Sequence, residues 1–321
     1  MVEKIILDTD PGIDDAMALL FAEAHPDIEL IGITTVFGNA TVENSTRNAQ
    51  FLKDKFQFTC DIAKGAEAPL EREPVGPSSH VHGEGGFGDV DVSCVDMTGL
   101  SDKPAYRYII DTLRENPDEI TLVAVGPLTN LALALEEDES ITSLVKEVVV
   151  MGGAFGLNNR RGNITPHAEA NIHDDPHAAQ KVFSASWPIS VIGLDVTESS
   201  VFDDCYFRSL KEEAGQVGEL IWDVSRFYLK FYSSLIGFNG CHVHDPSAIA
   251  CVVQPELFEF EVGAIEVTTE GEQQGMTTLL KGESSHGKVI HKVAAKVNTD
   301  ALLTMYRDKT VAFGKKFENA K

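Results

Sequence analysis

Residues 5–24 read IILDTDPGIDDAMALLFAEA, in which a strand-like run passes through an acidic turn into a helix-like run. Ile5–Leu7 is short and apolar, and the residues from Asp14 to Ala24 have the apolar periodicity of a helix. The same alternation recurs along the chain, where apolar runs stop at Gly, Pro or polar residues and helical patterns follow. This order predicts an α/β fold, Rossmann-like, with an open, mainly parallel (mixed) sheet and helices on both faces.

The alternation locates further elements, each by an apolar run that ends at a turn signal or by an apolar repeat of helical period. Strands are predicted at 28–36, 120–125, 148–151 and 189–192, and helices at 42–56 and 128–135. The chain has no internal repeat and no linker-like shift in composition, so we expect one domain over residues 1–321.

Open α/β sheets bind ligands beyond the carboxyl ends of their strands. We therefore expect the active site at that edge of the sheet. A Gly- and Pro-rich loop at 64–89 and a second loop at 153–170 are long enough to be functional. The turns at the expected edge are 8–15, 37–39, 125–127 and 151–153.

Composition limits the classes of function. The 321 residues carry a net charge of −24, from 50 acidic and 26 basic residues. Such a surface repels nucleic-acid phosphates and anionic membranes, so we expect neither as a partner and favour a small neutral substrate. Five cysteines form no CxxC pair, and we find neither a signal peptide nor an apolar stretch long enough to span a bilayer. These features predict a cytoplasmic protein.

The acidic turn is the strongest chemical signal in the sequence. Asp8, Asp10, Asp14 and Asp15 place four carboxylates within eight residues, where they repel one another. A bound cation removes this repulsion, and carboxylates suit Ca²⁺ or Mg²⁺. Capping of the following helix explains one or two of these acids but not four. The turn therefore predicts a metal site.

This turn resembles the signature of the inosine-uridine-preferring nucleoside hydrolases, and the resemblance covers roughly residues 4 to 255. It continues, in the order of that family, through 38–39, 125–130, 151–153, 168–172 and the His244-Asp245-Pro246 segment. The resemblance implies hydrolysis of the N-glycosidic bond of ribonucleosides to ribose and a free nucleobase, as in nucleoside salvage. It also implies a bound Ca²⁺ and a homo-oligomer, a dimer or a tetramer. The implied calcium ligands are the carboxylates of Asp10, Asp15 and Asp245 and the carbonyl of Val125.

The resemblance also implies which residues bind the substrate. Hydroxyls of a ribose donate and accept, and Asn, Asp and Glu offer matching partners. Taken alone, Asn163 or Asn171 is better explained as a turn residue, and Tyr232 equally well as a core residue. Ala170 departs from several relatives, which have an aromatic residue there. The implied ribose contacts are Asp14, Asn39, Asn163, Glu169 and Asn171, with Met151 packed nearby and with His82 and Tyr232 near the base.

The implied mechanism needs a base and an acid. The metal would lower the pKa of a bound water, and Asp10 would take its proton as general base. His244 would protonate the departing nucleobase, a duty that His82 could share. The segment at Asp245-Pro246 is also a good helix start, and both interpretations can hold together.

Three alternatives compete with this interpretation. A haloacid-dehalogenase-type phosphatase also begins with Asp-x-Asp after its first strand, but here Pro11-Gly12 replaces the usual Gly-Thr continuation. A zinc hydrolase would use the His-x-His pairs at 80/82 and 242/244, since zinc favours nitrogen ligands. The third is a catalytically weak member of the same fold that binds ribose or nucleosides without turnover.

Overall fold

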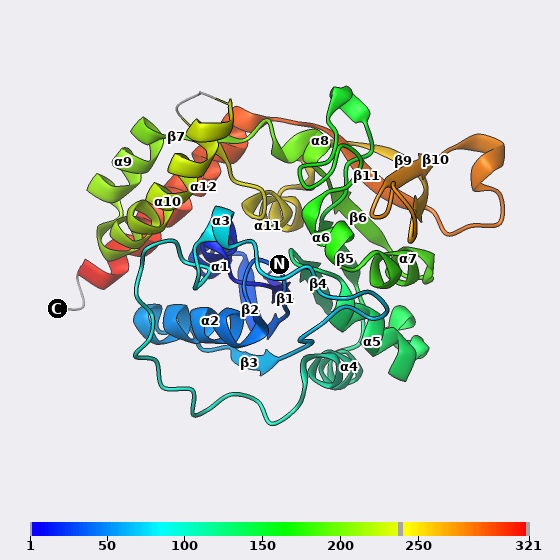
Figure 1. Ribbon diagram of the computed structural model, residues 1–321. Coiled ribbons are helices and arrows are strands. Elements are labelled where there is room, and N and C mark those ends of the chain that lie inside the picture. The colour runs from blue at the N-terminus through cyan, green and yellow to red at the C-terminus, as the bar shows by residue number, and fades with distance from the viewer. Residues whose placement is uncertain (1, 237–239, 319–321) are drawn as a thin grey trace.

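The computed structural model describes residues 2–236 and 240–318. Its centre is a nine-stranded sheet in the order β10-β9-β11-β6-β5-β4-β1-β2-β3 (Figure 1). The strands from β3 to β11 in this order run parallel, and β9 is antiparallel to both of its neighbours. The predicted mainly parallel, mixed sheet is therefore confirmed. The strands are β1 Glu3–Thr9, β2 Ile28–Thr35, β3 Asp61–Lys64, β4 Ile120–Ala124, β5 Glu147–Met151, β6 Ile189–Ile192, β9 Phe258–Val267, β10 Thr277–Leu280 and β11 His291–Val297.

Helices cover both faces of this sheet (Figure 1). Ile5 and Leu7 of β1 point into one core with α1, α2 and α9 to α12, whereas Ile6 points into the other with α4, α5 and α7. β7 (Val201–Asp203) and β8 (Gly240–His242) form a separate antiparallel pair. The helices are α1 Ile13–Ala24, α2 Val42–Phe56, α3 Ser79–His82, α4 Ala105–Glu115, α5 Thr129–Glu137, α6 Ala170–Asp174, α7 Pro176–Ser184, α8 Leu194–Thr197, α9 Asp204–Glu213, α10 Gly215–Ile236, α11 Pro246–Val253 and α12 Thr299–Glu318.

Helix α1 follows the acidic turn and is buried along nearly its whole length. Its Ala, Leu and Met residues favour a helix, and Asp14 and Asp15 complement the positive end of the helix dipole. The helix ends at Ala24 because Pro26 disfavours helical geometry at His25, which is extended. The carboxylates of the first turn are thus carried into the interior by an apolar helix.

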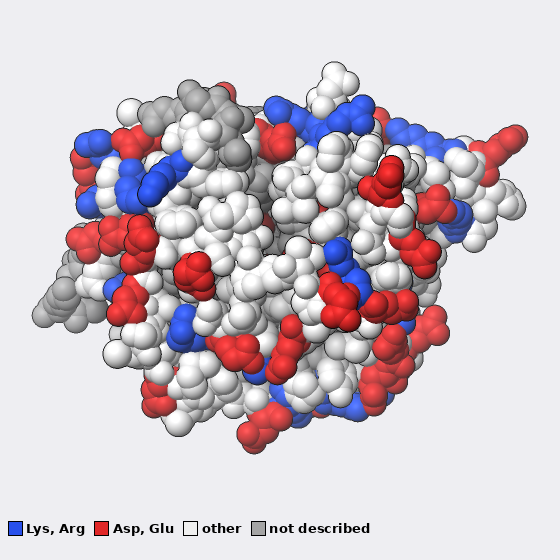
Figure 2. Space-filling view, viewed as in Figure 1, with Lys and Arg blue, Asp and Glu red and all other residues white. Residues whose placement is uncertain are grey.

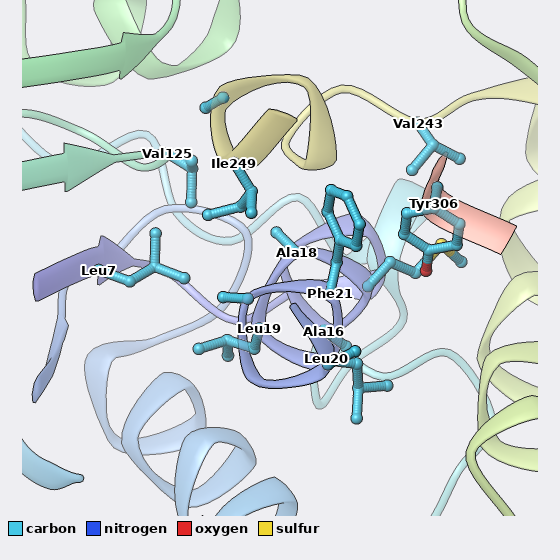
Figure 3. Close-up of a cluster of buried hydrophobic side chains, with 14 of the residues drawn as sticks. Leu7, Ala16, Ala18, Leu19, Leu20, Phe21, Val125, Val243, Ile249 and Tyr306 are labelled. Atoms are coloured by element: carbon cyan, nitrogen blue, oxygen red, sulfur yellow. The ribbon is translucent and has the colours of Figure 1, made fainter. Parts of the chain in front are cut away.

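The packing around α1 fixes where the acidic turn lies. Figure 3 shows Leu7 of β1, Val125 just after β4 and Ile249 of α11 on one side of the helix. On another side, Phe21 packs against Tyr306 of α12 with ring centroids 5.1 Å apart. Because these side chains are fully buried, the helix has little freedom to shift relative to the sheet.

The strand order creates the crevice that the predicted site requires. From β1 the chain builds outward through β2 and β3 on one side, and it later builds through β4, β5 and β6 on the other. The connections after β1 and β4 therefore leave in opposite directions, which opens a crevice at the carboxyl ends of these strands. The acidic turn and Val125 both lie at this point.

Within the described residues, no helix combines the length and the apolar character needed to cross a membrane. All five cysteines are free thiols.

Asn130, from the segment that follows β4, links three neighbouring strands. Its side-chain amide donates to Asp8 Oδ1 at 2.8 Å and to the Thr35 carbonyl at 2.9 Å. Its Oδ1 accepts from the Ala66 amide at 2.9 Å. Oδ1 of Asp8, which also accepts from Thr34, is therefore occupied within the framework of the sheet, whereas Oδ2 has no hydrogen-bond partner among the described residues.

We predict that Asn130→Ala lowers the free energy of unfolding by about 2–4 kcal/mol, because the Thr35 carbonyl and the Ala66 amide lose this partner and Asp8 keeps only its bond from Thr34. Urea denaturation measures this change. The control Asn44→Ala removes an exposed amide that donates to Glu84 at 3.3 Å, and it should cost less than about 0.5 kcal/mol. Equal effects of the two substitutions would contradict the role assigned to Asn130.

Candidate active site

A cavity of about 380 Å³ opens at the carboxyl ends of the central strands. The surface over the middle of this face, between α3 and α6, carries few charged side chains, whereas acidic residues are common around it (Figure 2). The cavity collects residues from turns that are far apart in sequence, as predicted. The predicted residues that line it are Asp14, Asn39, His82, Val125, Met151, Asn163, Glu169, Asn171, Tyr232, His244 and Asp245.

Three carboxylates meet beneath the cavity. Asp14, Asp15 and Asp245 are buried, and one oxygen of each lies within 4.8 Å of the others. Asp15 is held firmly, since it accepts from Thr9 Oγ1 at 2.6 Å and from the Gly12 amide at 2.9 Å. The second of these bonds also caps helix α1, so the capping and metal-site interpretations of this residue hold together.

Asp10 adds a fourth buried carboxylate. Its Oδ2 accepts from the Asn39 amide at 2.6 Å, while its buried Oδ1 has no hydrogen-bond partner among the described residues. Gly38 and Gly126 make room for it, because a Cβ on either would come within 2.1 Å and 2.6 Å of an Asp10 oxygen. The Asn39 side chain donates to Asp15 at 2.9 Å and so ties the two acids together.

The electrostatics of this group favour a bound cation. Burial, and after it the charges of neighbouring acids, raise the pKa of Asp10, Asp14 and Asp245, that of Asp14 to about 7. Burial also raises the pKa of Asp15. So many buried carboxylates cannot all stay charged unless positive charge lies among them.

The donor set fits a hard cation. Among the described residues, Asp14, Asp15 and Asp245 form the only group of three or more His, Cys, Asp or Glu placed to hold a metal ion. Neither His-x-His pair belongs to that group, which favours calcium or magnesium over zinc. Asp14, predicted as a ribose contact, lies inside the group, and Asp10, predicted as a ligand, lies beside it with one unpaired oxygen.

The opposite side of the cavity is organised by helix α6. Glu169 caps this helix by accepting from the amides of Asn171 at 2.9 Å and Ile172 at 3.1 Å. The Asn171 side chain donates to the Val125 carbonyl at 2.9 Å and to the Met151 carbonyl at 3.2 Å. A carbonyl oxygen has two lone pairs, so Val125 keeps one for a further partner.

Asn163 comes from the loop before α6 and stands at the exposed rim of the cavity. Its Oδ1 accepts from the Ala170 amide at 3.0 Å. The side-chain amide of Asn163 therefore has an orientation fixed by the backbone, as expected for a residue that presents donors to a polar ligand.

Two histidines face the cavity from different segments. His82 Nδ1 accepts from the Ile13 amide at 3.1 Å, so the neutral ring carries its proton on Nε2. His244 lies 2.8 Å from Thr197 Oγ1 through Nδ1 and 3.3 Å from the Tyr232 hydroxyl through Nε2. Burial, and then the charges of nearby histidines, lower the pKa of both rings to about 3.

Helix α10 contributes an aromatic wall to the cavity, of which only Tyr232 was predicted from the sequence. Tyr228 and Phe231 join Tyr232 along the cavity, and their spacing by three and four residues places them on one helical face. Tyr228 packs edge-on against Tyr232 with centroids 5.1 Å apart, and its hydroxyl donates to Asp14 at 3.4 Å. The helical period around Tyr232 is the signal that could have identified its neighbours.

Other lining or supporting residues carried no signal of a site in the sequence. Thr197 reaches His244 from the α8 segment, and Arg160 and Glu198 pair at the rim. These contacts join segments that lie far apart in sequence, so only the folded chain reveals them.

Known proteins resemble this chain over most of its length. Residues 5–304 match the family model described as inosine-uridine preferring nucleoside hydrolase. The chain is similar to uridine nucleosidase 1 of Arabidopsis thaliana, at 40% identity over 281 residues that cover 87% of this chain and 82% of that protein. It is also similar to the inosine-uridine preferring nucleoside hydrolase of Crithidia fasciculata, at 39% identity over 280 residues that cover 86% and 87% of the two chains.

Solved structures share the fold. The purine-preferring ribonucleoside hydrolase from Gardnerella vaginalis superimposes with a TM-score of 0.92 at 30% identity. The match covers 98% of this chain and 100% of that chain.

We predict that calcium stabilises the protein more at pH 7.5 than at pH 5. Because the pKa of Asp14 is raised to about 7 in the metal-free fold, from about 3.9 when unfolded, its contribution to stability is present below about pH 4. That contribution is lost as the pH rises to about 7, where the charged carboxylates repel unless a cation is bound. Thermal unfolding of metal-free protein, with and without added Ca²⁺, measures the difference.

Asp245→Asn removes one of the repelling carboxylates and should reduce the effect of calcium at both pH values. A calcium-induced rise in Tm that is the same at pH 5 and pH 7.5 would argue against a cation among these acids.

Proposed function

The chain belongs to the inosine-uridine preferring nucleoside hydrolase family, N-glycosidases that act on ribonucleosides, and we propose that it uses Ca²⁺ and Asp10 to cleave its substrate with water. The products would be ribose and a free nucleobase. The observation that carries this proposal is the buried Oδ1 of Asp10, which has no partner among the described residues, beside the carboxylates of Asp14, Asp15 and Asp245. This arrangement combines a proton acceptor with oxygen ligands in one place.

We propose that Asp10, Asp15, Asp245 and the Val125 carbonyl hold the Ca²⁺. Their oxygens are the hard ligands that calcium prefers, and burial at the switch point shields them from bulk water. When bound, calcium would neutralise the carboxylates and supply the positive charge that lowers the pKa of water. Asp14, which lies in the same group, would accept a hydrogen bond from a ribose hydroxyl.

Asp10 is the proposed general base. The Asn39 amide occupies its Oδ2 and leaves Oδ1 to take the proton from the attacking water. The glycines at positions 38 and 126 keep side chains away from these oxygens. The resulting nucleophile attacks the anomeric carbon as the glycosidic bond breaks with oxocarbenium-ion character.

The ribose would lie between the acids and α6. Glu169 and Asn171 are fixed by the backbone bonds described above, and Asn39 and Asn163 flank the same space. Met151 lines the apolar part of the sugar site. A sugar held by fixed polar groups loses less entropy on reaching the transition state, so these contacts favour catalysis as well as binding.

His244 is the proposed proton donor to the departing base. Thr197 and Tyr232 hold the ring from its two nitrogens, and the aromatic wall of α10 lies next to it. Burial lowers the pKa of the ring to about 3, so the ring is neutral before the reaction begins. Negative charge that develops on the departing base raises this pKa, so the ring takes up a proton from solvent and passes it to the base. His82 offers Nε2–H to the same space.

The names of the relatives describe activity on uridine, on inosine and uridine, and on purine nucleosides. Base release from uridine, inosine and adenosine is therefore the direct test of the proposed activity. Ribose binding without base release would favour the alternative of a member that lost turnover.

We further propose that the enzyme serves nucleoside salvage in the cytoplasm as a homo-oligomer, a dimer or tetramer. The five free thiols are consistent with a reducing compartment. A sheet whose strands run from Glu3 to Val297 supports one domain for the whole chain. Analytical ultracentrifugation tests the assembly.

We predict that Asp10→Asn lowers kcat on every nucleoside by about 10²–10⁴-fold, because it removes the acceptor of the water proton. Asp8→Asn is the matched control, since Asp8 is an equally buried acid two residues away that contacts Thr34 and Asn130. That variant should retain kcat within about threefold of the wild type, an allowance for small packing changes. If Asp10→Asn keeps wild-type turnover, Asp10 is not the base.

We predict that His244→Ala reduces turnover strongly for natural nucleosides and much less for p-nitrophenyl riboside. A nitrophenolate leaves without protonation, whereas a nucleobase needs a proton, so only the second reaction loses its acid. Steady-state kinetics on both substrates, in variants that retain the wild-type Tm, measures the contrast. An equal loss on the two substrates would show that His244 positions the substrate instead.

A further inference from the structure

The loop between β5 and α6, residues 152–169, forms part of the rim of the cavity and carries Asn163 and Ile164. Its far end is tied to α6, since Ala170 donates to Asn163 and the amide of Ile164 donates to the carbonyl of Ala168 at 3.2 Å. Its near end is tied to another part of the molecule. The middle of the loop, between these two anchors, is the part that crosses the rim.

The near anchor is Asp195, at the start of α8. Its Oδ2 accepts from the Phe155 amide at 2.8 Å, and its carbonyl accepts from the Asn158 side chain at 3.2 Å. Asn158 also donates to the Ala295 carbonyl at 2.7 Å. Asn158 and Asn159 both have left-handed backbone geometry, with φ of 61° and 59°. Asparagine tolerates this geometry better than other non-glycine residues, and the hydrogen bonds of Phe155 and Asn158 hold the loop in it.

After Asn158 and Asn159, the side chain of Arg160 reaches across the rim of the cavity to Glu198. The guanidinium Nη1 lies 2.9 Å from Oε2, and the two side chains are 43% and 19% exposed. Arg160 is the one Lys or Arg among the described residues that line the cavity. Glu198 therefore receives its countercharge from the loop, in a cavity whose other charged lining groups are acids.

Glu198 connects the loop to the leaving-group side of the cavity. It directly follows Thr197, whose hydroxyl contacts His244 Nδ1 at 2.8 Å. Arg160, Glu198 and His244 all line the same cavity. The ion pair thus joins the loop that carries Asn163 to the segment that supports His244.

We propose that the Arg160–Glu198 ion pair is a latch that holds the β5–α6 loop closed over a bound nucleoside. The inference rests on the proposed function for its substrate, and both residues are positioning residues that act through Asn163 and its neighbours. The latch sets the fraction of the protein whose loop is in the closed, binding-competent state. Loss of the latch lowers this fraction, and the apparent Kd and KM rise in inverse proportion to it. The rate of bond cleavage in the closed complex changes little.

The kinetic test uses Glu198→Gln, which keeps the shape of the side chain and removes its charge. We expect KM for a hydrolysed nucleoside to rise about two- to fivefold, as is usual for a partly exposed ion pair, with kcat within about twofold of the wild type. Arg160→Glu should be similar or worse, and the double change Arg160→Glu plus Glu198→Arg should restore KM. Added salt should raise KM of the wild type and leave KM of Glu198→Gln nearly unchanged.

A second readout does not depend on catalysis. Trypsin cleaves after Arg161, which is exposed in the loop, at a rate that follows loop opening. We expect Glu198→Gln to speed this cleavage about two- to fivefold. The reversed pair should be cleaved more slowly than Arg160→Glu alone, which has the same residues around Arg161. The control Arg114→Gln breaks a distant pair with Asp138, of 2.8 Å and with 51% and 14% exposure, and should change neither readout.

The outcomes separate the latch from the activity. Failure of the wild type to hydrolyse any nucleoside would refute the proposed function, and the trypsin measurement would still decide whether the latch exists. Wild-type KM and wild-type cleavage in Glu198→Gln would overturn the latch. A loss of kcat without faster cleavage would overturn it too, since Glu198 would then act through Thr197 and His244. A reversed pair no better than Arg160→Glu alone would exclude a specific ion pair.

Discussion

Mutual repulsion among buried carboxylates is the constraint on which the rest of this structure depends. Four carboxylates lie together at the point where the strand order of the sheet reverses, those of Asp10, Asp14, Asp15 and Asp245. Burial raises the pKa of each. Without positive charge, such a group would protonate or move apart. The buried, apolar helix α1 keeps these carboxylates in place, so the packing of the hydrophobic core fixes the geometry of the site (Figure 3). A divalent cation would remove this repulsion and would let Asp10 stay charged, as its proposed role as general base requires.

The same arrangement separates two kinds of chemistry across one cavity. The floor is made of carboxylates and side-chain amides with fixed hydrogen bonds, which suits a cation and a polyhydroxylated sugar. The wall of α10 is aromatic, and the histidines beside it are neutral because they are buried, which suits a planar base. The glycosidic bond of a nucleoside joins a sugar to a planar base. The polar floor of the cavity therefore suits the sugar of a nucleoside, and its aromatic wall suits the base, which together form the substrate class of the family.

Much of the fold was predictable because it depends on local patterns. The helix at 42–56 and the strand from Ile28 matched the structure, and the cavity lies at the edge of the sheet where the rule for open sheets predicts ligand binding. The strands β9 to β11 were not predicted, although only the pairing of β11 with β6 joins segments that lie far apart in the chain. The turn predicted a group of acids, but the group nearest to metal geometry contains Asp14 and leaves Asp10 beside it. Side-chain directions over a few ångströms decide that difference, and no spacing in the sequence encodes them. The ion pair between Arg160 and Glu198 could not be predicted from the sequence for the same reason.

The central claim is that these carboxylates hold calcium, and metal analysis of the purified protein tests it most directly. Inductively coupled plasma mass spectrometry on protein dialysed against metal-free buffer should find about one Ca²⁺ per chain. The same measurement on Asp245→Asn should find much less, while Asp8→Asn, whose acid contacts Thr34 and Asn130, should match the wild type. Stoichiometric zinc, or equal calcium in wild type and Asp245→Asn, would contradict the account.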